Sequence, residues 1–256
     1  MTLSTPSVFE KLKHLDASLE LAWRGHLVIP TKIARDITVL PPQAHPDKQG
    51  LAQSCGQARL LHDLANIELQ AMELALRTLS EFQSADEKFR EDLKALVQSE
   101  AKHLALCIEG IQNLGFQWGD WPIHTVLWDA VSQDDSLLDR IFIVHRYLEG
   151  GGLDAGEILL KRLNGVAHSC VHPVVNTIVH EEIDHVKFGS DWYNYFCLQD
   201  GLDPLIDFKS RFEKLKPILP KRIEKTSYSF RKKAGFTETE LQLIDQFKDS
   251  CRIHKN

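Results

Sequence analysis

Long apolar runs are missing from this chain of 256 residues. No window approaches the roughly 20 consecutive apolar residues with which a helix crosses a bilayer. Residues 1–20 also lack the basic start and following apolar stretch of a secretory leader. We therefore expect a cytoplasmic protein without a membrane partner.

Cysteine is sparse and follows no pattern. The five cysteines are odd in number and none stands in a C-x-x-C pair, so reduced thiols are expected. Cys107 lies in an apolar periodic stretch, which favours a buried structural thiol over a reactive one. Low-complexity tracts and repeats of solenoid length are absent as well.

Charge is unevenly distributed along the chain. Hydrophobic residues make up 43% and charged residues 26%, which is typical of a globular protein with one main domain. The net charge is -6, yet Lys209 to Lys233 contains ten Lys or Arg against two Glu, a local charge of about +8. The protein as a whole is therefore not expected to attract nucleic acid. The basic segment itself is either a solvated face or a surface that contacts RNA.

Helical periodicity dominates residues 51–201. It predicts four long helices at about residues 52–82, 86–114, 136–163 and 173–198, each about 40 Å long. The gap before the third helix is about 20 residues long and can run the length of a bundle, so the order is hairpin, crossover, hairpin. An all-α fold is therefore predicted, in three parts: an N-terminal helix and proline-rich arm (1–50), a four-helix bundle (51–201) and a basic C-terminal extension with a terminal helix (202–256).

Two E-x-x-H motifs stand on the second and fourth predicted helices. Glu100 and His103 form the first motif, and Glu182 and His185 form the second. Residues three apart share a helix face, so the carboxylate and imidazole of each motif can bind one metal ion. Both motifs interrupt apolar stripes, which indicates that they face the core.

The other two predicted helices each offer a carboxylate. Glu149 lies in the apolar stripe of the third helix, and Glu68 lies in that of the first. Glu73 is turned about 140° away from Glu68, onto a polar face that we expect to be solvated. Glu68 precedes Glu100 by 32 positions and Glu149 precedes Glu182 by 33, which places the ligands at equal depth.

Four inward carboxylates would repel one another and lose solvation at a cost of several kcal/mol each unless cations were present. A two-metal site is therefore predicted. Mixed oxygen and nitrogen ligands suit iron or manganese, and zinc remains open. The predicted ligands are Glu68, Glu100, His103, Glu149, Glu182 and His185.

The order of these ligands, one carboxylate, E-x-x-H, one carboxylate and E-x-x-H, resembles that of the ferritin-like di-iron carboxylate proteins. The resemblance implies a ferritin-like four-helix bundle with one long crossover and two iron ions. Over residues 59–241 the chain more closely resembles an uncharacterised bacterial family, catalogued as a domain of unknown function and similar to di-iron tRNA hydroxylases acting on isopentenylated adenosine. The segments that carry this likeness are Arg59-Leu60-Leu61-His62, Ile67-Glu68-Leu69, Glu100-Ala101-Lys102-His103, Leu148-Glu149, Gly152-Leu153-Asp154, Glu181-Glu182-Ile183, His185-Val186 and Ala234-Gly235-Phe236.

Several residues are candidates for supporting the metal ligands. The resemblance implies that Glu181 hydrogen-bonds His103, with a surface glutamate as the alternative. Glu73 is a further candidate. His145, one turn before Glu149, and His124, in the crossover, could each approach the site; the favoured alternative for both is a buried histidine whose hydrogen bonds are satisfied elsewhere. The glycines that follow Glu149 indicate either room for oxygen or substrate or close helix packing; they are Gly150, Gly151, Gly152 and Gly156.

The leading hypothesis is a di-iron oxidase or oxygenase. It would use O2 and an electron donor to oxidise or hydroxylate an organic substrate that the sequence does not identify. A tRNA nucleoside is the sharpest version, and Lys209 to Lys233 would then contact RNA. The alternatives are a non-enzymatic metal-binding or iron-handling protein, and a degenerate scaffold with a partner-binding face. A monomer or dimer is favoured over a multi-subunit shell.

Overall fold

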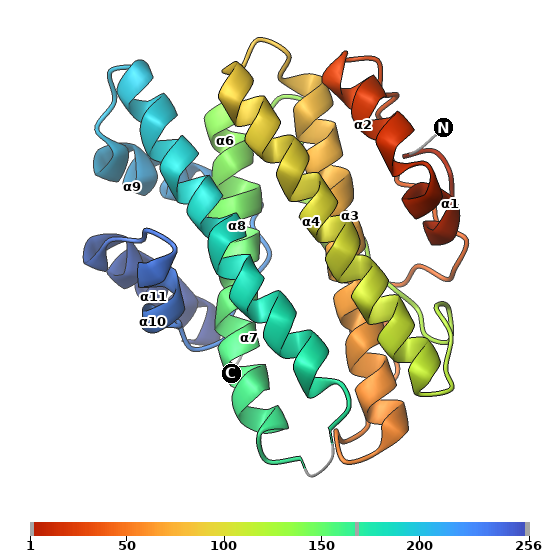
Figure 1. The fold of residues 1–256 in the computed structure, drawn as a ribbon. Helices are drawn as coiled ribbons and strands as arrows, with labels where there is room; N and C mark the ends of the chain where they lie inside the picture. The colour runs from red at the N-terminus through yellow and green to blue at the C-terminus, as the bar shows by residue number, and fades with distance from the viewer. Residues whose placement is uncertain (1–2, 167–168, 254–256) are drawn as a thin grey trace. The chain divides into compact units, whose positions relative to one another are not determined.

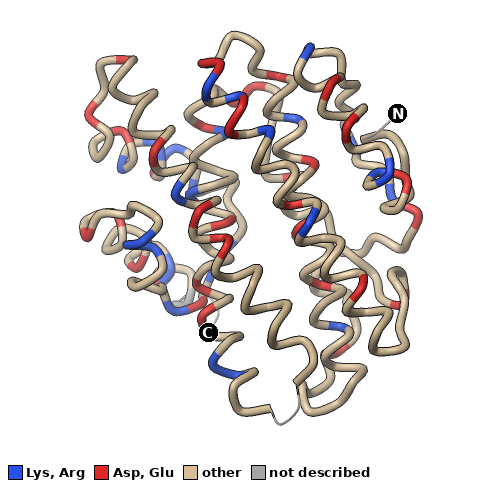
Figure 2. The backbone as a smooth tube through the Cα atoms, in the orientation of Figure 1, with Lys and Arg blue, Asp and Glu red and all other residues tan. Residues whose placement is uncertain are grey.

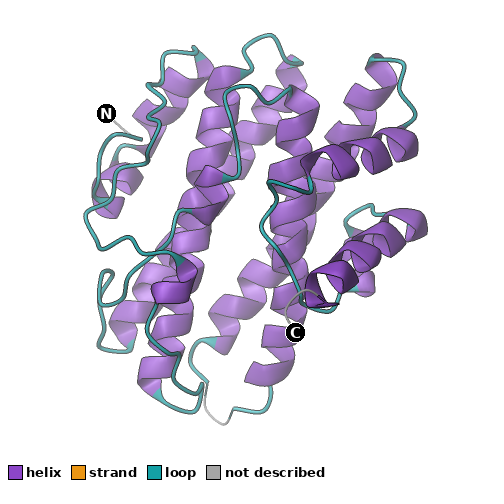
Figure 3. Cartoon of the chain, turned by 180° about the vertical axis from the view of Figure 1, so that it is seen from behind, coloured by secondary structure: helices purple, strands orange, loops and turns teal. Residues whose placement is uncertain are grey.

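The computed structural model describes residues 3–166 and 169–253, and these residues form helices joined by loops (Figures 1 and 3). Within this part of the chain there is no β-strand, only an isolated parallel bridge between Val39 and Ile123. The predicted all-α class is confirmed, and the structure is compatible with a helical bundle. None of the helices described is both long enough and apolar enough to span a membrane.

The helices divide between two compact units, Met1–Asp129 with Val166–Val174, and Ala130–Gly165 with Val175–Asn256. Those of the first unit are α1 (Val8–Lys13), α2 (Leu15–Trp23), the 3-10 turn η1 (Pro42–Ala44), α3 (Ser54–Glu81), α4 (Glu87–Asn113) and α5 (Val126–Asp129). The second unit holds α6 (Leu137–Ile141), η2 (Phe142–Glu149), α7 (Gly150–Leu163), most of α8 (His172–Gln199), α9 (Pro204–Leu215), α10 (Tyr228–Lys233) and α11 (Glu238–Ile253). The four long predicted helices thus correspond to α3, α4, the run from α6 to α7, and α8.

In the first unit, α3 and α4 form an antiparallel hairpin (Figure 1). Asp86 starts α4 because its side chain accepts hydrogen bonds from the backbone N–H groups of Lys88 and Phe89, at 2.8 and 3.2 Å. Gly110 lets the two helices pack closely, since a Cβ atom there would come within 2.5 Å of a methyl carbon of Leu61. This close packing brings the ligand-bearing stripes of both helices together.

The N-terminal arm covers a second face of α3, and one expectation about that face was wrong. Glu73 is not solvated: its side chain is fully buried. Lys11 Nζ lies 2.7 Å from Glu73 Oε1, and Arg35 donates to the same oxygen at 2.9 Å. The sequence pattern of α3 shows a polar face but cannot show that cations from a distant segment will pair with it and exclude water.

The crossover between α4 and α6 is tied to both α3 and the arm. The side-chain oxygen of Gln70 accepts from the backbone N–H groups of Leu127 and Trp128, at 3.1 and 3.2 Å. The backbone N–H of Leu40 in the arm donates to the carbonyl of Ile123 at 2.8 Å. These bonds fix the crossover along α3, which explains why Gln70 is buried despite its polarity.

In the second unit, the long helix predicted at residues 136–163, referred to below as the rod, is helical throughout but changes its winding along its length. Ser136 and Asp139 form a reciprocal capping box that starts α6. Residues Phe142–Glu149 then form a π-helix, in which each turn takes one residue more than an α-turn, before α7 resumes at Gly150. The π segment ends at Glu149, so the local winding sets the direction of this carboxylate.

The C-terminal helices pack against the rod through buried charges. Arg146 of η2 lies 3.0 Å from Glu240 of α11, and its guanidinium stacks on Phe236 at 4.5 Å. Glu240 also caps its own helix together with Thr237. Figure 2 shows positive and negative positions interspersed on these helices.

Part of the basic charge of Lys209 to Lys233 is neutralised within the second unit. Arg211 forms ion pairs with Asp139 and Asp207, and Lys214 lies 3.0 Å from Asp139. Arg222 takes no such pair among the described residues. The solvated face that the sequence allowed is therefore only a partial description of this segment.

Candidate metal centre

The first E-x-x-H motif lies in the middle of α4. Glu100 and His103 both have fully buried side chains, because they interrupt the apolar stripe with which α4 packs on α3. His103 Nδ1 lies 3.8 Å from Glu100 Oε2 and 3.4 Å from Oε2 of Glu68 on α3. The first unit therefore brings together one imidazole and two carboxylates, as the helix patterns predicted.

Cys107 lies one turn beyond His103 on α4 and is fully buried. Burial raises the pKa of the Cys107 thiol well above its usual value, and the negative charge of Glu68 raises it further. The thiol therefore stays protonated at neutral pH. This agrees with the buried structural thiol that the sequence favoured at Cys107.

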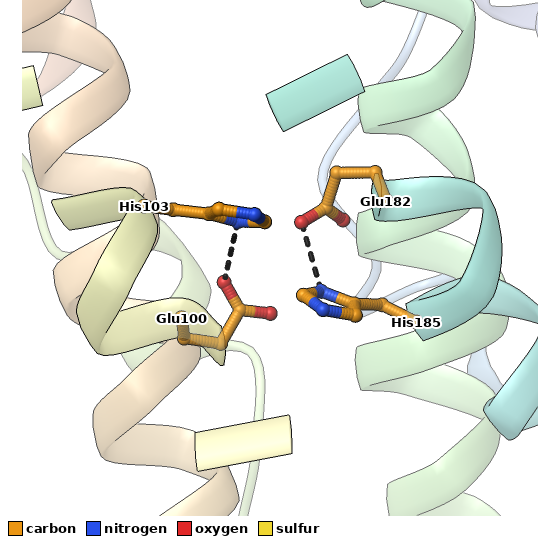
Figure 4. Close-up of side chains that lie close together, drawn as sticks. All are labelled: Glu100, His103, Glu182 and His185. Carbon is orange, nitrogen blue, oxygen red and sulfur yellow. Dashed lines mark ion pairs between the residues drawn. The ribbon is translucent and has the colours of Figure 1, made fainter. Parts of the chain in front are cut away.

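The second E-x-x-H motif lies on α8. His185 Nδ1 is 3.0 Å from Glu182 Oε1, and 8% and 13% of the two side chains, respectively, are exposed. Figure 4 shows each imidazole beside the carboxylate of its own motif, on α4 and on α8 alike. The same i, i+3 geometry thus appears twice in the chain.

Glu149, the carboxylate predicted on the third helix, is held by a histidine. His145 Nδ1 lies 2.9 and 2.8 Å from the two carboxylate oxygens of Glu149, and both side chains are buried. His145 also packs against α8, where a Cβ atom on Gly189 would come within 2.3 Å of the His145 Cβ atom. Gly189 is therefore required for this approach.

Glu100, His103, Glu182 and His185 form a buried cluster that could hold a metal ion (Figure 4). Each offers one ligand atom, and these four atoms lie within 4.8 Å of one another. Two imidazole nitrogens and two carboxylate oxygens are a donor set that suits iron, manganese or zinc. Glu68 and Glu149 are not members of this group of four, and their part in metal binding stays a prediction.

Other predicted supporting residues have different surroundings. Glu73 pairs with Lys11 and Arg35, and Glu181 is half-buried beside Glu182. The backbone carbonyl of His124 accepts from the side chains of Asn66 and Gln70 on α3. His145 has the clearest link to a predicted ligand, through its contact with Glu149.

The sequence did not reveal what lies against the glycines of α7. A Cβ atom on Gly156 would come within 2.8 Å of Val179, and one on Gly150 would come within 2.7 Å of Arg231. A Cβ atom on Gly152, by contrast, would meet nothing within 4 Å. Close packing therefore explains Gly150 and Gly156, and the run of glycines was the signal that another element approaches here.

The chain matches a known protein family over nearly its whole length. The family described as "Protein of unknown function (DUF455)" matches residues 5–242. The chain belongs to the DUF455 family. An uncharacterized protein of Haemophilus influenzae is 30% identical to this DUF455 chain over 215 residues, which are 81% of the chain and 74% of the relative. No solved structure matches the chain significantly.

Proposed function

We propose that this protein is a ferritin-like di-iron carboxylate protein that uses O2 to oxidise or hydroxylate an organic substrate. The observation that carries the proposal is the pair of buried E-x-x-H motifs on α4 and α8, whose four ligand atoms lie within 4.8 Å of one another. The order of the ligands in the sequence supports the same reading. Manganese and zinc are the alternatives to iron.

The chemistry of the side chains fits a divalent cation. Buried carboxylates lose solvation at a cost of several kcal/mol each, and this cost is offset when a cation accepts their charge. Two divalent ions would balance four carboxylates. The residues proposed to hold them are Glu68, Glu100, His103, Glu149, Glu182 and His185.

When bound, two ferrous ions supply coordination positions for O2 and electrons for its reduction. Hydroxylation places one oxygen atom in a C–H bond of the substrate and converts the other to water, which takes two electrons and two protons from an external donor. The chain's own residues hold the ligands in place and exclude water. His145 fixes the Glu149 carboxylate by hydrogen bonds, and the burial of Glu100 and His103 keeps bulk solvent away.

A nucleoside of tRNA is the substrate that we favour within this proposal. It is supported by the family resemblance and by the exposed cations near the start of α10, which include Lys221 and Lys225. Replacing Lys221, Arg222 and Lys225 together by Gln should weaken RNA binding and flatten its dependence on salt. Replacing Lys13, Lys88 and Lys94 in the first unit removes the same charge and serves as the control. Unchanged RNA binding in the first triple variant would contradict this substrate.

Metal content tests the central claim. Protein purified without oxygen should carry about two metal ions per chain by elemental analysis. The variant Glu182→Ala with His185→Ala should carry fewer. The matched control, His180→Ala with Asp184→Ala, removes one histidine and one carboxylate from the exposed face of α8 and should retain the metal. Equal metal content in the two double variants would contradict the proposal.

Oxygen uptake separates an oxygenase from an iron-handling protein. Uptake that requires an organic substrate and an electron donor supports the oxygenase. Uptake that stops once ferrous iron is oxidised, with no organic product, favours simple iron handling. Gel filtration that shows a monomer or dimer excludes a storage shell.

A further inference from the structure

The loop that leads into α10 packs along one stripe of residues on the continuous helix formed by η2 and α7. The stripe consists of Tyr147, Gly150, Gly151 and Asp154, spaced as neighbours on one helix face. Tyr147 donates from its hydroxyl to the backbone carbonyl of Pro220 at 2.6 Å. Further along, the loop and α10 reach the glycines and Asp154. The loop therefore follows the helix directly beyond Glu149.

Arg231 of α10 lies flat along this stripe. Its Nε and Nη2 atoms donate to the two oxygens of Asp154, at 2.9 and 2.8 Å, and only 2% of the residue is exposed. Its third nitrogen, Nη1, is turned toward Gly150, where a Cβ atom would come within 2.7 Å. Nη1 is buried and has no hydrogen-bond partner among the described residues.

Arg222 lies against the next glycine. A Cβ atom on Gly151 would come within 3.3 Å of Arg222 Nε, which is buried and also lacks a hydrogen-bond partner in the described part of the chain. The hydroxyl of Thr226, in the same loop, is a third buried group without a partner there. Three hydrogen-bonding groups from one short loop and α10 are thus left unsatisfied.

The charges around these groups do not balance. Asp154 is the carboxylate that pairs with both Arg231 and Lys248, and Lys248 Nζ lies 2.5 Å from it. Burial alone would raise the pKa of Asp154, but hydrogen bonds from Arg231 and the charges of Arg231 and Lys248 lower it below its usual value. Arg222 adds a further positive charge. Glu224, the acidic residue of this loop, accepts from the backbone N–H of Ile223 instead of forming an ion pair with a described residue.

We propose that Arg222 and Arg231 bind a phosphate group of the substrate on the glycine face of α7. A phosphate offers several acceptor oxygens and negative charge, which guanidinium groups and a hydroxyl match by charge-assisted hydrogen bonds. Side chains larger than hydrogen at positions 150 and 151 would displace the guanidinium groups. The inference rests on the proposed function, because Gly150 directly follows the proposed ligand Glu149 and a phosphate here would anchor the substrate beside the metals.

Titration of the full-length protein with inorganic phosphate, followed by calorimetry, tests this site. Wild type should bind phosphate saturably, and Arg222→Gln should weaken binding by about fivefold or more. Lys94→Gln, which removes the same charge from an exposed position of α4 outside the basic segment, should change it less than about twofold. Gly151→Ala should weaken binding, whereas Gly152→Ala should not, because a Cβ atom at position 152 meets nothing.

Absence of saturable binding to the wild type would overturn the proposal, as would equal effects of Arg222→Gln and Lys94→Gln. Metal content is measured on the same samples and should be unchanged in all four variants. A variant that loses phosphate binding but keeps its metal has therefore lost only the phosphate site. A wild-type protein that contains no metal would instead contradict the proposed function.

Two further titrations identify the source of the phosphate. Adenosine 5'-monophosphate represents a small phosphomonoester, and a short single-stranded RNA represents a phosphodiester chain. The probe whose affinity falls more in Arg222→Gln identifies the class of substrate. If Arg222→Gln affects neither probe, the proposal is wrong.

Discussion

His145 binds both carboxylate oxygens of Glu149 through a single ring nitrogen, at 2.9 and 2.8 Å. Since a carboxylate only accepts hydrogen bonds, Nδ1 of His145 carries the proton. Both residues lie in the π-helical segment, four positions apart. A proposed metal ligand is thus oriented by a neighbour on its own helix, and carboxylates that bind metals are usually held by such hydrogen bonds.

Replacing His145 should weaken metal binding. We expect His145→Ala to lower the apparent metal affinity by about 10- to 100-fold, because Glu149 loses the group that orients it. His145→Asn should restore part of the affinity, since the Asn amide can donate near the position of Nδ1. Competition with a chelator measures the affinity. If the Asn variant binds metal no better than the Ala variant, the role assigned to this hydrogen bond is wrong.

Two glycines should respond in opposite ways to a methyl group. Gly189→Ala should destabilise the protein by about 1 to 3 kcal/mol, because its Cβ atom would meet His145 at 2.3 Å and force it to move. Gly152→Ala should stabilise it by up to about 1 kcal/mol, since the position is exposed, helical and open. Urea unfolding of the metal-free protein compares the two. A neutral effect of Gly189→Ala would contradict the packing described for α8.

Glu73 and Glu68 lie on the same helix but should have separable roles. Glu73→Gln would leave Lys11 and Arg35 buried without a counter-charge, at a cost of about 3 to 5 kcal/mol in stability. Its metal content should stay that of the wild type. Glu68→Gln should instead lower the metal content, because Glu68 lies 3.4 Å from His103. Elemental analysis and urea unfolding of both variants check the assignment. Loss of metal in Glu73→Gln with unchanged metal in Glu68→Gln would show that the roles of the two glutamates are assigned the wrong way round.

His62 should make stability depend on pH. The ring of His62 stacks on Trp118 and accepts a hydrogen bond from the backbone N–H of Gly119. Burial lowers the pKa of His62 from 6.5 to about 4. Between pH 6.5 and 4, His62 is therefore protonated in the unfolded chain but stays neutral in the folded chain. The free energy of unfolding falls as the pH is lowered through this range. The contribution is roughly 2 to 3 kcal/mol.

The measurement is urea unfolding at pH 7, 5.5 and 4.5. His62→Gln should lose less stability on acidification than the wild type, whereas His26→Gln, at an exposed position, should follow the wild type. Parallel curves for all three proteins would argue against the buried neutral state of His62.

The helix positions and the two E-x-x-H motifs could be read from the sequence because they depend on local spacing. Apolar residues every three or four positions set the faces of α3, α4 and α8, and the same spacing turns Glu100 and His103 inward together. Glu68 was favoured over Glu73 by the same argument. The cap at Thr237 and Glu240 is likewise a local pattern.

The burial of Glu73 could not be read this way. It results from Lys11 and Arg35, which are 62 and 38 positions away in the chain. The π-helical winding before Glu149 and the contact of Gly189 with His145 also depend on which element packs against which. No periodicity within one helix contains that information.

The sequence by itself determined that this protein is helical, that carboxylates and imidazoles interrupt its apolar stripes, and that basic residues gather near its C-terminal end. Only the tertiary structure decided which polar groups are neutralised and which are left with unsatisfied nitrogens, as in Arg222 and Arg231. The reason is physical: helix periodicity acts over a few residues, whereas the partner of a buried charge is set by the packing of segments far apart in the chain.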